Sequence, residues 1–150
     1  MRLNPEEVTG LVLSLLSDEL RWDKWRGNEN AVAGQCYTAS EVCRALLGPA
    51  WEPYMVPHER SFHWFLRHRD TGEILDATVA QFQQLPSYEK ARPACFGRRT
   101  SAASEVLLWR VLEGLGAASR QEGSVTARSA RPGEEARGRE RPMAGRRGAD

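Results

Sequence analysis

The helical spacing of apolar residues in this chain ends at Leu115, and this end limits how much of the chain can fold. Residues 117–150 contain no aromatic residue, and their only larger apolar side chains are Val125 and Met143. A segment with so few apolar side chains cannot offset the conformational entropy that it would lose on ordering. The sequence therefore predicts a single domain over residues 1–116 and a disordered Arg/Gly/Glu-rich tail over residues 117–150.

The positive charge of the chain lies in this tail. The whole chain has a formal net charge of +1, whereas residues 117–150 hold eight arginines and no lysine against five acidic residues. The glycine-spaced arginines of residues 137–139 and 145–148 could contact RNA or another polyanion. The interspersed acids dilute the charge, so the simpler interpretation is a solvated tail with no role of its own.

Three observations bear on the compartment. No stretch of the sequence approaches the ~18 consecutive apolar residues of a membrane span. Acidic Glu6 and Glu7 stand near the N-terminus, where a signal peptide would have its hydrophobic run. The cysteines, Cys36, Cys43 and Cys95, are odd in number and sparse, which favours free thiols over a disulfide framework. We expect a cytoplasmic protein without membrane contact, and the sequence does not indicate its oligomeric state.

Hydrophobic spacing predicts helices and strands in a mixed order. Three segments have helical spacing: residues 4–20, 36–47 and 101–115. Three others read as strands: residues 51–56, 61–67 and 73–79. Asn4 and Pro5 are typical of a helix start, and Gly48 with Pro49 is typical of a helix end. Residues 80–99 are irregular, and the order of the elements predicts an α+β fold.

The residues that indicate chemistry are Cys36, His63 and Asp76. Cys36 stands at a predicted helix N-terminus, where partial positive charge lowers the pKa of a thiol and backbone N–H groups can hold an oxyanion. Gly34 would let the chain turn sharply and let a substrate approach the sulfur. His63 would act as general base and then general acid, and Asp76 would orient its imidazole.

Each of these residues taken alone has a simpler structural explanation. A cysteine at a helix start is usually a small buried side chain, and a histidine in a strand is usually only hydrogen-bonded. The chain order of thiol, imidazole and carboxylate is what favours a catalytic set over three separate structural residues.

The position of Asp76 depends on the turn before it. A four-residue turn over residues 70–73 would place Asp76 opposite Arg67, on the same face as His63 but about 13 Å from it. A shifted turn or a bulge would bring the two side chains together. The alternative residues for orienting the imidazole are Asn28 and Asn30.

Other residues complete the candidate site. Gln35 and Asn30 are candidate oxyanion or substrate-binding residues. Trp64 is a further candidate for substrate binding, although as the strand neighbour of His63 it should face the opposite way and pack behind the site. The histidines at 58, 63 and 68 alternate faces on a strand and form no paired-ligand motif, so we expect no metal and no other cofactor.

Three short segments resemble a known family. Asn30-Ala-Val-Ala-Gly-Gln-Cys36, Ser61-Phe62-His63-Trp64 and Asp76-Ala-Thr-Val-Ala-Gln-Phe82 resemble the YunG-like family of small, largely uncharacterised bacterial and phage proteins. More distantly, the order of the three residues is similar to papain-like and transglutaminase-like proteins. This resemblance implies a papain-like α+β fold in which Cys36 is the nucleophile, His63 the base and Asp76 the orienting acid.

Two functions from different classes agree with the sequence. The first is a cysteine-dependent hydrolase or acyltransferase that acts on an amide, ester or thioester of a small molecule, peptide or protein through a Cys36 thioester. The acceptor, water or an amine, is decided by pocket shape and water exclusion. The second is a non-catalytic binding or accessory module that keeps the fold, with a tail that binds a polyanion such as a nucleic acid.

Overall fold

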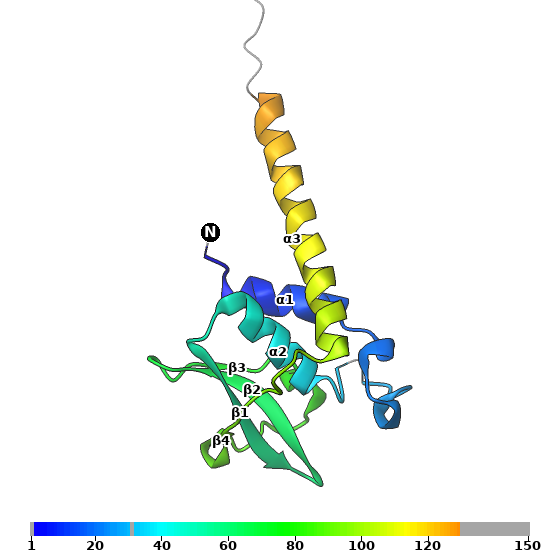
Figure 1. Cartoon of the computed structure of the whole chain (residues 1–150), viewed down its shortest axis with the longest axis vertical. Coiled ribbons are helices and arrows are strands. Elements are labelled where there is room, and N and C mark those ends of the chain that lie inside the picture. Colours follow the sequence, from blue (N-terminus) through cyan, green and yellow to red (C-terminus); the bar gives the residue numbers. More distant parts are fainter. Residues whose placement is uncertain (1, 31, 130–150) are drawn as a thin grey trace, which may run out of the picture.

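The protein has an α+β architecture, in which three α-helices pack on a small antiparallel sheet (Figure 1). The computed structural model describes residues 2–30 and 32–129. The sheet has the strand order β3-β2-β1-β4. Helix α2 packs on β1 and β2, whereas α1 and α3 contact α2 and each other. The helices therefore form two layers on one side of the sheet.

Helix α1 spans Pro5–Leu15 and begins as its sequence predicts. The Asn4 side chain accepts a hydrogen bond of 2.9 Å from the backbone N–H of Glu6, which satisfies one donor of the first turn. The helix ends earlier than its apolar spacing suggests. Leu20 belongs to a separate 3₁₀ turn at Asp18–Leu20, and its side chain is buried in the core. The predicted N-terminus is confirmed, and the last apolar residue of the pattern belongs to the connection.

Helix α2 spans Cys36–Leu47, with the bounds that the sequence predicts. It ends at Gly48, whose φ of 101° is a conformation that glycine adopts without a steric penalty. The middle of the helix faces the core, where the side chains of Ala39, Val42 and Cys43 are almost fully buried. Its first residue, Cys36, lies outside this core and faces a cleft.

The sheet is built around one long hairpin. Strand β1 (Trp51–His58) pairs with β2 (Ser61–His68) along their whole length, from Trp51 opposite His68 to His58 opposite Ser61. Strand β3 covers only Ile74–Leu75 and strand β4 only Arg92–Pro93. The strand expected over residues 73–79 is therefore much shorter than predicted, and the chain leaves the sheet at Asp76.

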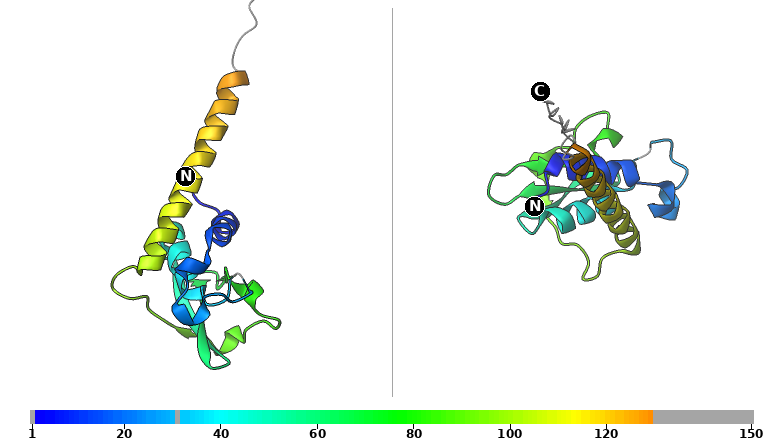
Figure 2. Two further views of the ribbon diagram at one scale, coloured as in Figure 1. Left: turned by 90° about the vertical axis from the view of Figure 1, so that its right-hand side faces the viewer. Right: turned by 90° about the horizontal axis from the view of Figure 1, so that it is seen from above.

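Helix α3 spans Ala102–Ser129 and extends well beyond the rest of the molecule (Figure 2). Its first part packs on α1 and α2 through Leu107 and Val111. The sequence analysis ended this helix at Leu115, whereas in the structure it continues to Ser129. Residues 117–129 of the expected disordered tail are therefore helical, and residues 130–150 lie outside the described part of the chain.

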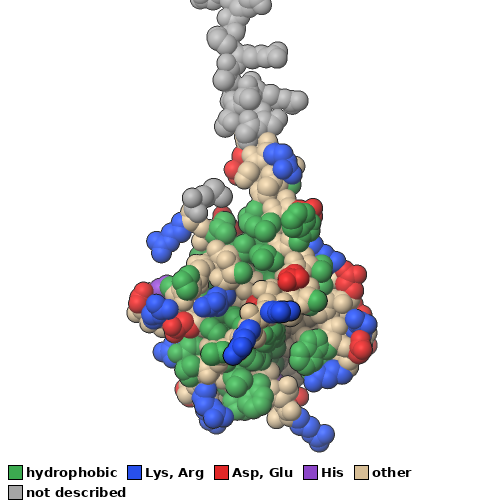
Figure 3. Space-filling view, in the orientation of Figure 1, with side chains coloured by type: hydrophobic (Ala, Val, Ile, Leu, Met, Phe, Trp, Pro, Cys, Tyr) green, Lys and Arg blue, Asp and Glu red, His purple; other side chains and the backbone are tan. Residues whose placement is uncertain are grey.

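Several hydrophobic side chains remain exposed on this face of the molecule, including along α3 (Figure 3). In α3, the side chains of Val106, Trp109 and Leu112 are exposed. Within the described residues, no helix has the length and apolar content that crossing a membrane would need.

Candidate active site

His63 and Asp76 form a buried pair. His63 Nε2 lies 2.6 Å from Asp76 Oδ2, and the two side chains are only 2% and 4% exposed. A short contact between an imidazole nitrogen and a carboxylate in such a dry setting fixes the orientation of the ring. The structure thus brings together two of the residues predicted from the sequence, and Asp76, not Asn28 or Asn30, contacts the imidazole.

The pairing register explains how Asp76 reaches His63. Leu75 lies opposite Leu66 and Ile74 opposite Arg67, so the register is shifted by two residues from the one that a four-residue turn over residues 70–73 would give. The turn keeps four residues but lies one residue earlier in the chain, because the backbone N–H of His68 bonds to the carbonyl of Glu73 and encloses residues 69–72. The β3 pairing ends at Leu75, and Asp76 bends toward the imidazole from outside the regular sheet.

Tyr88 is a further member of this cluster that the sequence analysis did not identify. Its hydroxyl donates a 2.7 Å hydrogen bond to Asp76 Oδ2, the oxygen that also contacts His63. Burial, the hydrogen bond to Asp76 and the charge of Asp76 all raise the pKa of Tyr88, which keeps the hydroxyl protonated. The backbone N–H of Thr78 donates to the other carboxylate oxygen at 3.3 Å. Both Asp76 oxygens therefore have fixed partners.

The thiol of Cys36 contacts the same imidazole. Burial lowers the pKa of His63, but hydrogen bonds to Asp76 and Cys36, and the charges of both groups, outweigh it and raise the pKa to about 9. Because Asp76 takes Nε2, the nitrogen left for the thiol is Nδ1. The imidazole is thereby held as a cation between a carboxylate and a sulfur at neutral pH.

Gly34 is required for the expected turn and also for a close contact that the sequence did not indicate. Its φ of +74° confirms the sharp turn. A Cβ at this position would lie 2.3 Å from the indole of Trp25, so the space beside the glycine is filled by an aromatic ring. Because Gly34 has no side chain, the Trp25 ring packs directly against the backbone just before Cys36.

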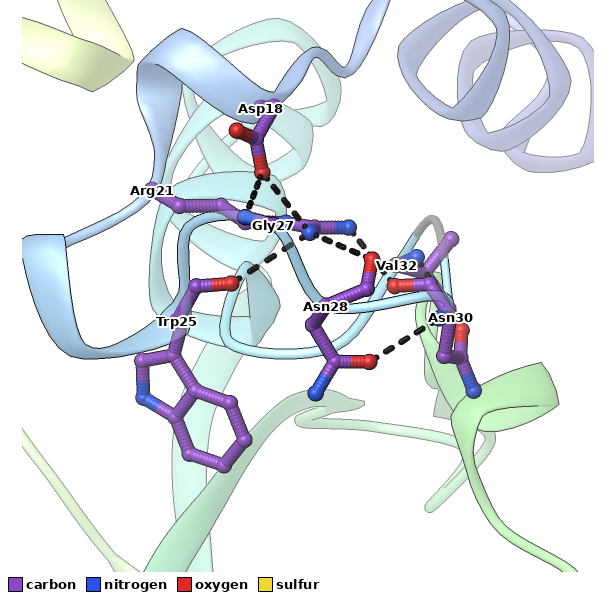
Figure 4. Close-up of polar contacts among 7 residues, drawn as sticks. All are labelled: Asp18, Arg21, Trp25, Gly27, Asn28, Asn30 and Val32. Atoms are coloured by element: carbon purple, nitrogen blue, oxygen red, sulfur yellow. Dashed lines mark hydrogen bonds and ion pairs between the residues drawn. The ribbon is translucent and has the colours of Figure 1, made fainter.

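A buried arginine organises the loop that leads to Cys36 (Figure 4). Arg21 is 4% exposed and donates to the carbonyls of Trp25, Asn28 and Asn30, the last at 2.6 Å. Asp18 accepts from the Arg21 guanidinium and from the backbone N–H of Gly27, both at 2.9 Å.

The backbone of this loop faces Arg21, while the Trp25 indole points away from it (Figure 4). The sequence analysis missed this role because residues 21–35 have little periodicity.

A cleft of about 800 Å³ opens onto Cys36 and His63. One wall comes from the loop before α2, and the other from the end of the β1–β2 hairpin and from Gln81 and Phe82. Cys36 and His63 both line it. The backbone N–H groups of the first turn of α2 have no acceptor within the helix, so this end of the cleft can stabilise negative charge.

The other predicted site residues differ in their positions. Asn30 lines the cleft, and its side chain donates to the carbonyl of Gln81 at 3.3 Å. Trp64 packs on Tyr37 of α2, away from the contacts of His63, but also lines the cleft, so it is not simply behind the site. Gln35 is 1% exposed at the helix start and is not among the lining residues.

Gln81 lies beside the imidazole of His63. Its amide nitrogen lies 2.9 Å from the Thr78 hydroxyl and 3.4 Å from His63 Nδ1, and the residue lines the cleft. The side-chain amide of Gln81 therefore lies beside His63 Nδ1, the ring nitrogen that is left for the Cys36 thiol. The sequence feature that could have placed Gln81 in the site is its position five residues after Asp76, in the same Asp76–Phe82 segment.

The remaining cysteines and histidines lie apart from this pair. Cys43 is buried and Cys95 exposed, and all three cysteines are free thiols. His58 packs edge-on against Phe82, whereas His68 contacts Trp51 at the other end of the hairpin. Across residues 2–30 and 32–129, no group of three or more His, Cys, Asp or Glu side chains has an arrangement that could hold a metal ion.

Comparison with protein-family models, with curated proteins and with solved structures finds no match to this chain.

Proposed function

We propose that the protein is a cysteine-dependent hydrolase or acyltransferase with a papain-like, transglutaminase-like arrangement of Cys36, His63 and Asp76. The observation that carries the proposal is the buried His63–Asp76 pair, whose imidazole also contacts a thiol at the start of a helix and at the wall of a cleft. A purely structural histidine needs neither the thiol nor the opening. The resemblance to the YunG-like family agrees with this proposal and remains an expectation.

The reaction follows from the protonation states that this geometry supports. The Cys36 sulfur, as thiolate beside the His63 cation, attacks a carbonyl carbon, and the carbonyl electrons move onto its oxygen. The donors that we assign to this oxyanion are the backbone N–H of Cys36, at the start of α2, and the side-chain amide of Gln81, which lies beside His63. The oxyanion then collapses, the bond to the leaving group breaks, and His63 donates its Nδ1 proton to that group.

The second half of the reaction releases the acyl group. Neutral His63 takes a proton from water or an amine, which attacks the thioester carbonyl. The carbon–sulfur bond breaks, and the thiolate–imidazolium pair is restored. Asp76 keeps Nε2 protonated throughout and so holds Nδ1 toward the sulfur.

An activated ester tests the proposal without a known substrate. We expect p-nitrophenyl acetate to release p-nitrophenol in a burst equal to the amount of protein, with the acetyl group found on the peptide that contains Cys36. Cys36→Ser should abolish the burst, and His63→Ala should slow it by about 10²-fold or more. Adding a primary amine separates the two outcomes, since an amide formed faster than from a small-molecule thioester at the same amine concentration indicates acyl transfer and acetate alone indicates hydrolysis.

The control is Cys95→Ser, which removes an exposed thiol outside the cleft. It should leave the burst unchanged. Equal acetylation of Cys36 and Cys95, with no effect of His63→Ala, would contradict a catalytic role and favour the binding module.

A further inference from the structure

The cleft places aromatic rings on both sides of the reactive pair. The Trp25 indole is packed against Gly34, two residues before Cys36. On the opposite wall, the Phe82 ring meets the His63 ring edge-on, with centroids 4.5 Å apart. A group bound next to the sulfur therefore lies between aromatic surfaces whose positions are fixed by packing.

Two more aromatic side chains extend these walls to the rim. Trp22, on the loop before α2, is 68% exposed, and Phe62, on β2, is 49% exposed. Both line the cleft. Large aromatic side chains exposed around one concave site are typical of a binding surface, because isolated exposure would leave apolar area in water without a benefit.

Positive charge at the same rim is not neutralised within the described residues. The Lys24 ammonium lies 5.8 Å from the ring centroids of both Trp22 and Trp25. Neither Lys24 nor Arg60, on the facing hairpin, forms an ion pair within residues 2–30 and 32–129. The one acid of the rim, Glu59, lies 3.9 Å from His58. A ligand that carries an anion would complement this arrangement.

We propose that the substrate is an acyl compound with an aromatic ring near the reacting carbonyl and a carboxylate that faces Lys24 and Arg60. The ring would stack between the Trp22–Trp25 wall and Phe62. This inference rests on the proposed function, since it assigns the substrate class of the same cysteine site. The amino-acid chemistry that fits is the C-terminal end of a peptide, or a free acid, with an aromatic side chain.

Four electrophiles with the same reactive group separate the two parts of the inference. They are the N-chloroacetyl derivatives of phenylalanine, phenylalaninamide, glycine and glycinamide. In each, the Cys36 thiolate displaces chloride and forms a thioether, so no further reagent is needed. The rate of Cys36 alkylation, divided by the rate for free cysteine under the same conditions, reports recognition by the cleft.

We expect N-chloroacetyl-phenylalanine to react fastest. The aromatic ring should raise the normalised rate about tenfold over the glycine compounds. The carboxylate should raise it about threefold or more at low salt, and this gain should shrink at high salt because the charges are exposed.

Variants assign each preference to its wall. Trp22→Ala and Phe62→Ala should reduce the preference for phenylalanine, while Lys24→Glu should reverse the preference for the carboxylate. Trp109→Ala is the matched aromatic control, because it removes an exposed tryptophan of α3 that is not among the cleft residues. Lys90→Glu is the matched charge control, on an exposed residue that does not line the cleft.

The failure of this inference is distinct from the failure of the proposed function. If Cys36 reacts faster than Cys95 with all four compounds and shows no preference among them, the substrate class is wrong and the catalytic pair stands. If Cys36 reacts no faster than Cys95 with any of them, both proposals are overturned.

Discussion

Cys36 and Cys43 lie on the same helix, about two turns apart, and differ in everything that decides the chemistry of a thiol. Cys43 is fully buried among apolar side chains, and burial raises its pKa to about 12. Cys36 lines a cleft and contacts an imidazole that is held by a carboxylate. The two cysteines thus differ because polar side chains of other elements meet the helix at its start and not at Cys43, and the proposed reaction needs that convergence.

The largest expected effect tests whether Arg21 maintains the start of α2. Arg21→Met should lower the free energy of unfolding by about 3 to 4 kcal/mol, because three loop carbonyls and Asp18 lose their donor. Denaturant unfolding measures this loss. Arg26→Met is the control, since Arg26 forms only an exposed ion pair with Asp23 and should change stability by less than about 1 kcal/mol.

A second variant, Arg21→Lys, tests whether Arg21 positions Cys36 or only stabilises the fold. Arg21→Lys should recover part of the stability but not the fork of hydrogen bonds to the loop carbonyls. Under conditions in which Arg21→Lys is folded, we expect Cys36 to be acetylated more slowly than in the wild type. Full recovery of the wild-type acetylation rate in Arg21→Lys would show that the hydrogen bonds of Arg21 to the loop carbonyls only stabilise the fold.

The next effect concerns pH. His63 has a pKa of about 9 in the folded protein against an ordinary value of 6.5, so the folded state binds its proton more tightly than the unfolded state. The resulting stabilisation is complete below about pH 6.5 and is lost as the pH rises through 9. This loss amounts to about 3 kcal/mol. Unfolding at a series of pH values should show the decline in the wild type and a flatter profile in His63→Phe.

A smaller effect separates the two cysteines by stability. Cys43→Ser should destabilise the protein by about 2 kcal/mol, because it buries a hydroxyl among apolar side chains. Cys36→Ser should change stability by less than about 0.5 kcal/mol. Thermal or denaturant unfolding of both variants provides the comparison, and a larger loss for Cys36→Ser would indicate that its role is structural.

The smallest effect concerns the third element of the cluster. Tyr88→Phe removes the hydroxyl that donates to Asp76 and leaves the ring packed on Phe65. We expect Cys36 acetylation to slow by about tenfold, or about 1.4 kcal/mol, which is near the lower end of the range for one hydrogen bond to a charged group. Tyr54→Phe is the matched control, because its ring stacks on the same Phe65 while no hydrogen bond joins its hydroxyl to Asp76 within the described residues.

Local signals in the sequence identify the start and end of α2 and the hairpin β1–β2. The bounds of α2 follow from its apolar spacing and from Gly48, and the hairpin follows from two runs of strand formers. These elements are predictable because their signals lie within the elements themselves. The predicted thiol and imidazole therefore lie where the sequence analysis expected them, one at a helix start and one on a strand.

The rest of the site depends on contacts between distant segments. Asp76 reaches His63 only because the β2–β3 register is shifted and the strand ends early, and no local pattern indicates either feature. Tyr88 and Arg21 lie in stretches without periodicity, so their roles appear only when the chain is folded. The continuation of α3 past Leu115 runs through a segment with few apolar side chains, so the apolar spacing that places the end of the helix gives no signal for it.

The most direct test of the central claim is the pH dependence of iodoacetamide alkylation, measured for Cys36, Cys43 and Cys95 separately by peptide mass spectrometry. We predict that Cys36 stays reactive well below the ~8.5 at which an ordinary thiol ionises, that Cys95 follows the ordinary profile, and that Cys43 does not react in the folded protein. His63→Ala should remove the advantage of Cys36 and leave Cys95 unchanged. A Cys36 profile that matches that of Cys95, with or without His63, would contradict the thiolate–imidazolium pair.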